Sequence, residues 1–179
     1  MTQEIYQKAM KFAGEKHCDQ QFPGSTANYL LHIANVSMEI FLAYHNAPDF
    51  DLDQAIQLAI LHDVIEDTDT DYQEVENRFG KQIADGVLAL TKDETLPGKA
   101  EQMADSLERI NQQAKEVGMV KLADRISNLQ APPHYWSKQK ITQYREEAKT
   151  ILMALTNKNE YLHNRLTQKI ENYKSFLIS

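Results

Sequence analysis

The chain has 179 residues, enough to bury one sizeable hydrophobic core and few for two domains. Its content of 42% hydrophobic and 25% charged residues is typical of a globular protein and argues against disorder. The formal net charge of −7 argues against nonspecific binding to nucleic acid, which needs a basic face against the phosphates. An anionic substrate would therefore need a local cation, and a bound metal is the simplest candidate.

The composition also bears on the cell compartment. Segment 1–10 lacks the apolar run of a secretory signal, and no apolar stretch approaches the roughly 20 residues that span a bilayer. The single cysteine, Cys18, rules out an internal disulfide, and no Cys/His cluster indicates structural zinc. We therefore expect a cytoplasmic protein with no membrane or nucleic-acid partner; its oligomeric state stays open.

Apolar residues recur with the spacing of amphipathic helices from one end of the chain to the other. The first predicted helix, 4–15, places Ile5, Ala9 and Phe12 on one side. Capping residues, glycines and prolines delimit the further helices, expected over residues 28–44, 51 or 53 to about 67, 71–80, 83–90, 100–115, 117–129, 137–156 and 160–176. Strand-like alternation, repeats and long linkers are absent. The prediction is one all-α domain, a helical bundle covering residues 1–179.

The most informative stretch, residues 59–68, reads AILHDVIEDT. On a continuous helix its four ionisable side chains share one arc, at about 0°, 40°, 100° and 140° for His62, Glu66, Asp63 and Asp67. Three carboxylates so close together repel each other unless a cation or solvent compensates. A solvated helix end would explain Glu66 and Asp67 equally well, but His62 and Asp63 interrupt an apolar run and fit that interpretation poorly.

Two further polar residues stand out on other predicted helices. His32 lies in a mostly apolar stretch, where a lone histidine is more often a satisfied core residue than a ligand. Asp124 shares a helix face with Lys121 and Asn128, and a surface ion pair of Asp124 with Lys121 or Arg125 is the simplest alternative. Together with His62 and Asp63, these residues follow the order His, His-Asp, Asp of the HD superfamily. Two imidazoles and two carboxylates suit manganese or iron, and four protein ligands leave two octahedral positions for water and a phosphate oxygen.

The resemblance extends beyond this superfamily pattern. The chain is similar to the hydrolase domain of the RelA/SpoT enzymes, and the Glu66-Asp67 pair one turn after His62-Asp63 distinguishes that branch. The stretches that carry the resemblance are His62 to Thr68, Phe79-Gly80, Leu90-Thr91-Lys92, Val120 to Arg125 and Asn128-Leu129. Trp136-Ser137 followed by Tyr144 resembles the small alarmone hydrolases, including the metazoan SpoT homologues. The similarity begins near His17-Cys18-Asp19-Gln20 and covers nearly the whole chain.

The resemblance implies an enzyme that uses manganese (Mn²⁺) to remove pyrophosphate from the 3′ position of guanosine tetra- and pentaphosphate. It implies that the metal ligands are His32, His62, Asp63 and Asp124. Glu66 and Asp67 would deprotonate the attacking water or protonate the leaving ribose oxygen. Three further residues match positions that hold the nucleotide substrate in the family: Lys121, Asn128 and Tyr144. For Lys121, a solvated surface lysine is an alternative interpretation.

The first loop departs from the family pattern. Where the family has an Arg-Lys pair after its His-x-x-Gln motif, this chain has Gln21 and Phe22, and Ile33 replaces a proline. Tyr29 is retained, and Phe22 offers an aromatic face for a base. The poorly matching segment 99–115 is a further departure. The base preference therefore stays open among guanine and adenine alarmones, NADPH and other nucleotides.

Two other functions remain as alternatives. One is an HD phosphohydrolase that acts on a different phosphoester, which the Gln21-Phe22 loop favours. The other is a non-catalytic regulator that binds metal or nucleotide, although inactive domains usually lose the metal ligands or the Glu-Asp pair and this chain keeps both.

Overall fold

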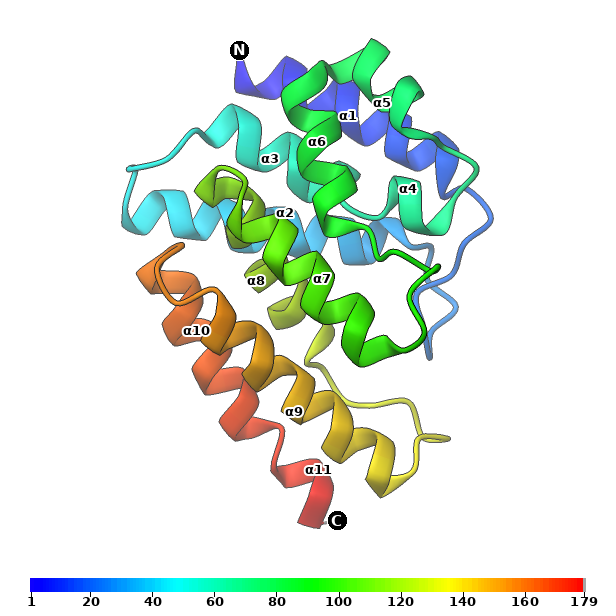
Figure 1. The fold of residues 1–179 in the computed structure, drawn as a ribbon, viewed down its shortest axis with the longest axis vertical. Coiled ribbons are helices and arrows are strands. Elements are labelled where there is room, and N and C mark those ends of the chain that lie inside the picture. Colours follow the sequence, from blue (N-terminus) through cyan, green and yellow to red (C-terminus); the bar gives the residue numbers. More distant parts are fainter. Residues whose placement is uncertain (179) are drawn as a thin grey trace.

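The computed structural model describes residues 1–178, and helices make up its architecture (Figure 1). In chain order the helices are α1 (Thr2–Lys16), α2 (Leu30–Asn46), α3 (Leu52–Leu61), α4 (Val64–Asp67), α5 (Tyr72–Phe79), α6 (Lys81–Leu90), α7 (Lys99–Asn111), α8 (Lys115–Asn128), α9 (Lys138–Ala154), α10 (Glu160–Asn172) and α11 (Ser175–Ile178). Within the described part, extended pairing is limited to one antiparallel bridge between Gln21 and Asn28. The all-α prediction is confirmed.

Two helices form the centre of the hydrophobic core. From Gln54 to Leu61, α3 buries every residue except Gln57, and it packs against α1, α2, α6 and α8. Helix α8 contacts α2, α3, α6, α7, α9 and α10, so it joins the upper and lower parts of the molecule in Figure 1. Because both helices are enclosed, a polar side chain on either of them lies in a low-dielectric interior unless it opens onto a cleft.

The predicted caps explain where several helices begin. The side chains of Asp51, Asp71 and Ser137 accept hydrogen bonds from backbone N–H groups in the first turns of α3, α5 and α9. Asn28 lies one residue before the cap position of α2, and its Oδ1 accepts from the Leu30 N–H at 3.0 Å. Gly80, at φ 90°, allows the tight connection between α5 and α6.

Two predicted helices are broken. The helix expected to run to about residue 67 ends at Leu61, and α4 begins after His62 and Asp63. Asp63 has φ −106° and ψ 0°, and the His62 Nδ1 bonds to the Ala59 carbonyl at 2.9 Å, so local side-chain bonding accompanies the bend. The expectation of one continuous helical arc for these residues was therefore wrong. The last predicted helix is likewise divided into α10 and α11 around the buried Tyr173.

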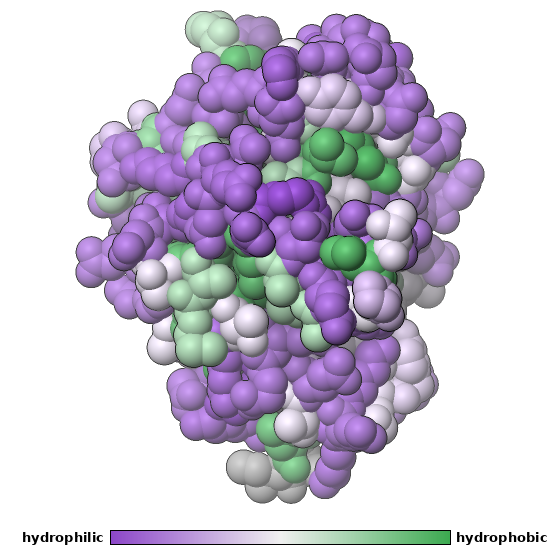
Figure 2. Space-filling view, viewed as in Figure 1, coloured by the Kyte–Doolittle hydropathy of each residue, from purple (hydrophilic) through white to green (hydrophobic). Residues whose placement is uncertain are grey.

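One face of the molecule is mostly polar. The face in Figure 2 is largely hydrophilic, with small separate hydrophobic areas. Among residues 1–178, no helix is both long and apolar enough to cross a membrane.

Candidate active site

Four predicted metal ligands meet where α2, α3 and α8 pack together. His32 comes from α2, His62 and Asp63 from the bend after α3, and Asp124 from α8. The two histidine Nε2 atoms lie 3.2 Å apart, His62 Nε2 lies 2.8 Å from Asp63 Oδ2, and His32 Nε2 lies 3.4 Å from Asp124 Oδ1. Candidate ligand atoms of His32, His62 and Asp124 all fall within 4.8 Å of one another. We call these four residues the histidine–aspartate cluster.

The donor set of the cluster fits a divalent cation. Because His62 Nδ1 faces a carbonyl oxygen, it carries the proton, and in the neutral ring Nε2 turns a lone pair toward the cluster. The His32 ring is fully buried, and its Nε2 points at the same place. Two imidazole nitrogens facing each other beside two carboxylates need a positive charge between them. Imidazole with carboxylate is a ligand combination that divalent transition metals favour.

The electrostatics of the cluster also favour a positive charge, because a proton on His62 and a metal ion would both compensate the same two carboxylates. Burial lowers the pKa of His62, but Asp63 and Asp124 outweigh burial and raise it to about 9. Burial raises the pKa of Asp63, but neighbouring His62 more than offsets this and holds the pKa well below its usual range. Burial likewise raises the pKa of Asp124, and Lys121 with the histidines reverses that shift. The carboxylates stay ionised and attract a cation.

Three residues predicted to hold substrate contact the cluster directly. The Tyr29 hydroxyl donates to Asp63 Oδ2, Lys121 Nζ lies 3.3 Å from Asp124 Oδ2, and Asn128 Nδ2 donates to Asp124 Oδ1. These bonds orient the two carboxylates, as outer contacts around metal ligands commonly do. The same three side chains also line the cleft that opens above the cluster.

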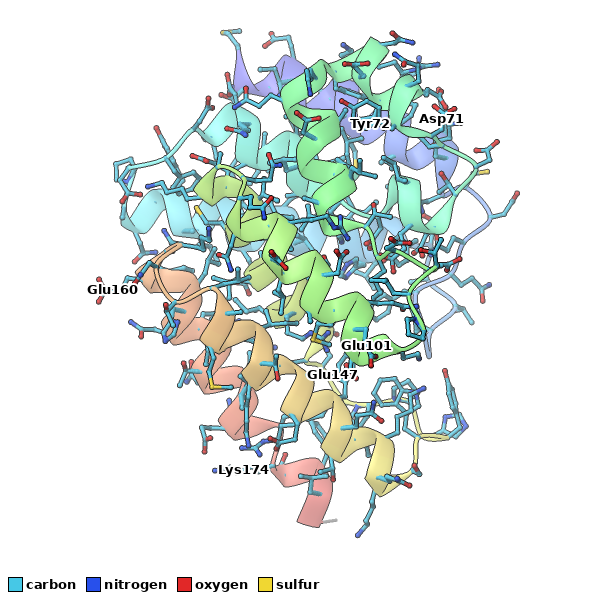
Figure 3. All side chains as sticks on the ribbon, viewed as in Figure 1. Asp71, Tyr72, Glu101, Glu147, Glu160 and Lys174 are labelled. Carbon is cyan, nitrogen blue, oxygen red and sulfur yellow. The ribbon has the colours of Figure 1, made fainter. Side chains whose placement is uncertain are left out.

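That cleft has a volume of about 830 Å³. It runs from the cluster between α7 and α9, where Figure 3 labels Glu147 on α9. The predicted site residues that line it are Tyr29, Asp63, Glu66, Asp67, Lys121, Asp124, Asn128 and Tyr144. The two histidines lie buried behind Asp63 and Asp124. A volume of this size is in the range of small-molecule sites.

Glu66 and Asp67, both on α4, are held by different partners. Lys92 bonds to both oxygens of Glu66, through its Nζ to Oε1 and through its backbone N–H to Oε2 at 3.1 Å. Asp67 Oδ2 accepts from the Gln20 side-chain amide at 2.8 Å. Burial raises the pKa of Asp67, whereas burial lowers that of Lys92 and Glu66 more than restores it. Glu66 thus has a cationic partner, Lys92, and Asp67 has a neutral partner, Gln20.

Phe22 and Tyr144 differ in position. The Phe22 ring stacks on the His32 imidazole, with centroids 5.9 Å apart and an interplanar angle of 16°, and it is not among the residues that line the cleft. Tyr144 does line the cleft; burial raises its pKa to about 12, and the Arg125 guanidinium lies 4.3 Å from its ring centroid. Of the two aromatic residues, the structure brings only Tyr144 to the cleft.

Several lining residues were not among the predicted site residues. Lys92, Lys99 and Lys140 place cations around the mouth of the cleft, and we call them the lysine rim. Arg125 and Trp136 line the wall beside Tyr144. Lys92 and Arg125 lie in the stretches that resemble the RelA/SpoT hydrolases, so this resemblance could have identified them as site residues. Lys99 and Lys140 come from the starts of α7 and α9 and belong to no motif, so only the packing of both helices on α8 brings them to one cleft.

Comparison with known proteins agrees with this geometry. The HD domain family matches residues 9–161, which is most of the chain. The chain belongs to the HD domain family. The fold and its buried histidine–aspartate cluster are those of a metal-dependent phosphohydrolase, which implies a divalent metal as cofactor.

Individual relatives show which members of the family the chain is similar to in sequence and fold. The chain is 34% identical over 167 residues to the guanosine-3′,5′-bis(diphosphate) 3′-pyrophosphohydrolase MESH1 of Danio rerio, covering 90% of this chain and 89% of that one. It is also 34% identical to MESH1 of Homo sapiens, covering 89% of each chain. A solved metazoan orthologue of SpoT, which hydrolyses ppGpp, superimposes with a TM-score of 0.81 at 28% identity over 97% of both chains. Protein lmo0812 of Listeria monocytogenes shares the fold, with a TM-score of 0.65 at 19% identity.

Proposed function

We propose that this protein hydrolyses guanosine 3′,5′-bis(diphosphate) and related alarmones and releases the 3′-pyrophosphate. The observation that carries the proposal is that one cleft holds both the histidine–aspartate cluster and the Glu66-Asp67 pair. The full-length similarity to the MESH1 pyrophosphohydrolases supports it. We also propose that residues 1–179 act as one domain, although residue 179 lies outside the described part. A cytoplasmic location stays a prediction.

The proposal assigns His32, His62, Asp63 and Asp124 as ligands of one divalent metal, which we expect to be Mn²⁺. When bound, such a metal supplies a Lewis acid that polarises a phosphoryl oxygen and lowers the pKa of water. Tyr29, Lys121 and Asn128 hold the two ligand carboxylates in place and border the space for the reacting phosphate.

Glu66 and Asp67 carry the proton transfers in this scheme. An oxygen–phosphorus bond forms between water and the 3′-phosphate, and the bond from that phosphorus to the ribose 3′ oxygen breaks. One of these two side chains takes a proton from the water, and one of them gives a proton to the 3′ oxygen, which leaves as a hydroxyl group. The products are guanosine 5′-diphosphate and pyrophosphate. Tyr144, beside Arg125, lies where the cleft would hold the nucleoside.

A second candidate is hydrolysis of another phosphorylated nucleotide by the same site. Two observations favour it. The first loop carries Gln21 and Phe22 where related enzymes have two cations, and Phe22 packs on His32 instead of lining the cleft. The loop therefore supplies no cation to a guanine nucleotide, and its aromatic ring is engaged with His32, so an adenine alarmone or NADPH is a further candidate substrate.

The two candidates differ in the nucleotide that is cleaved and, for NADPH and simple nucleoside phosphates, also in the group that is released. The purified protein, loaded with Mn²⁺, is incubated with guanosine 3′,5′-bis(diphosphate), its adenosine counterpart, NADPH and simple nucleoside phosphates. We expect pyrophosphate from an alarmone, loss of activity with a chelator, and recovery when Mn²⁺ is restored. Orthophosphate from NADPH alone would support the second candidate. Metal binding without release from any of these compounds would contradict both and favour a regulator.

A further inference from the structure

The loop after α1 contains a histidine and a glutamine that the proposed chemistry does not use. His17 is the C-cap residue of α1 and is 1% exposed, and the Gln20 N–H donates to its carbonyl at 3.1 Å. This turn brings the Gln20 side chain back beside the His17 ring. The Tyr29 N–H donates to the Gln20 carbonyl at 2.9 Å, and Asn28 Nδ2 donates to the His17 carbonyl at 3.2 Å. The backbone at both residues is therefore held in place.

The Gln20 amide bridges His17 and Asp67 in a defined orientation. Its Nε2 faces Asp67 Oδ2 at 2.8 Å, and because an ionised carboxylate only accepts hydrogen bonds, the nitrogen must lie on that side. Its Oε1 then faces His17 Nδ1 at 2.5 Å, so this ring nitrogen carries the proton. Burial lowers the pKa of His17, and the ring is neutral. The three side chains thus form one ordered chain of hydrogen bonds.

Packing alone does not explain why residue 17 is a histidine. Among the described residues, His17 Nε2 is buried and has no hydrogen-bond partner, which is unfavourable for a polar atom. An apolar side chain would avoid that cost. The ring also packs against Tyr29, with centroids 5.0 Å apart, and the Tyr29 hydroxyl donates to Asp63. His17, at the end of α1, therefore supports Asp67 through Gln20 and Asp63 through Tyr29.

The bond from Gln20 engages only one oxygen of Asp67. A cationic partner such as Lys92, which holds Glu66, neutralises the carboxylate that it orients. A neutral amide orients a carboxylate without neutralising it, and Oδ1 of Asp67 stays available for water or for the leaving oxygen. Such contacts behind a functional carboxylate commonly decide whether it points at the reacting atoms.

We propose that Gln20, oriented by His17, is a positioning residue that directs the Asp67 carboxylate toward the reacting phosphate. The inference rests on the proposed function of this cleft and adds to it a role for the first loop. Gln20 itself touches neither the histidine–aspartate cluster nor substrate in this scheme. Its effect on turnover is exerted through Asp67.

The test compares two substitutions of Gln20 in the Mn²⁺-loaded protein. Gln20→Met keeps the length of the side chain and removes both hydrogen bonds. Gln20→Glu keeps the acceptor for His17 but places a second carboxylate against Asp67. We expect kcat to fall roughly 10- to 100-fold in both, and at least as far in Gln20→Glu, with KM and metal affinity within about 2-fold of wild type. Gln168→Met, an exposed glutamine on α10, is the matched control.

The outcomes separate positioning from a purely structural role. A kcat within about 2-fold of wild type in Gln20→Met, at an unchanged melting temperature, would overturn the proposal. A loss of kcat that follows a loss of metal affinity or of folding in both variants would also overturn it.

A second measurement needs no activity. In wild type, ¹⁵N spectra should show the His17 ring protonated at Nδ1, and the ¹³C carboxyl signal of Asp67 should shift in Gln20→Met. If the wild-type protein hydrolyses no nucleotide, the proposed function fails. The Asp67 signal then tests the link between Gln20 and Asp67 without any activity measurement. An unchanged Asp67 signal would refute the link between Gln20 and Asp67.

Discussion

The histidine–aspartate cluster and the lysine rim are two ends of one cleft built in different ways. His32 and His62 are 0% and 2% exposed, and their ring nitrogens and the cluster carboxylates contact one another. The rim lysines are exposed and stand at or beyond helix ends; Lys140 extends over the Trp136 ring at 4.3 Å. The buried end is held by contacts among its own side chains, whereas Lys99 and Lys140 at the other end are exposed. We infer that the cluster determines the chemistry and the rim contributes to the choice of substrate.

The largest expected effect comes from breaking the cluster. Asp124→Ala removes a carboxylate that we propose as a metal ligand, together with the acceptor of Lys121 and Asn128, so metal binding and activity should both be lost. We expect a fall in kcat/KM of roughly 10³-fold or more, since a metal Lewis acid supplies several kcal/mol. Metal content and hydrolysis are measured together, and Asp49→Ala, an exposed aspartate on another part of the surface, is the control. Metal-dependent activity retained in Asp124→Ala would rule out the proposed site.

The second-largest effect is expected from Glu66→Gln, which separates the loss of proton transfer from the loss of metal binding. Glu66→Gln keeps the shape of the side chain but cannot take up a proton from water. We expect kcat to fall roughly 10²- to 10³-fold while the metal stays bound, because general acid–base catalysis contributes on that scale. Glu160→Gln, an exposed residue labelled in Figure 3, provides the control. Unchanged turnover in Glu66→Gln would remove this residue from the mechanism.

The smallest effect is expected at the rim. Lys140→Gln removes one exposed cation from the mouth of the cleft, and an exposed ion pair contributes about 1 kcal/mol or less. KM should therefore rise by about 5-fold or less with kcat unchanged, and the difference should shrink at high salt. Lys138→Gln, which is exposed on the same helix and does not line the cleft, is the matched control. A loss of kcat in Lys140→Gln would contradict the division between cluster and rim.

Particular residues show how far the sequence could be interpreted. Helical spacing and caps such as Asp51 and Ser137 predicted the helices, because these signals depend on neighbours in the chain. The same reasoning missed the bend at His62 and Asp63, since a helical wheel assumes the backbone stays regular. Its assignment of Phe22 as a ring for the base stays a prediction, and the structure shows that this ring stacks on His32.

The sequence by itself determined the fold class, the polar residues set into apolar helices, and the resemblance to a hydrolase family. Each of these depends on residue type and on spacing within a single segment. Only the tertiary structure decided which side chains meet: it placed Lys92 on Glu66, Gln20 on Asp67, and Lys99 with Lys140 at one cleft. The physical reason is that these contacts join segments distant in the chain, and their geometry follows from how α1, α4, α7 and α9 pack around the core.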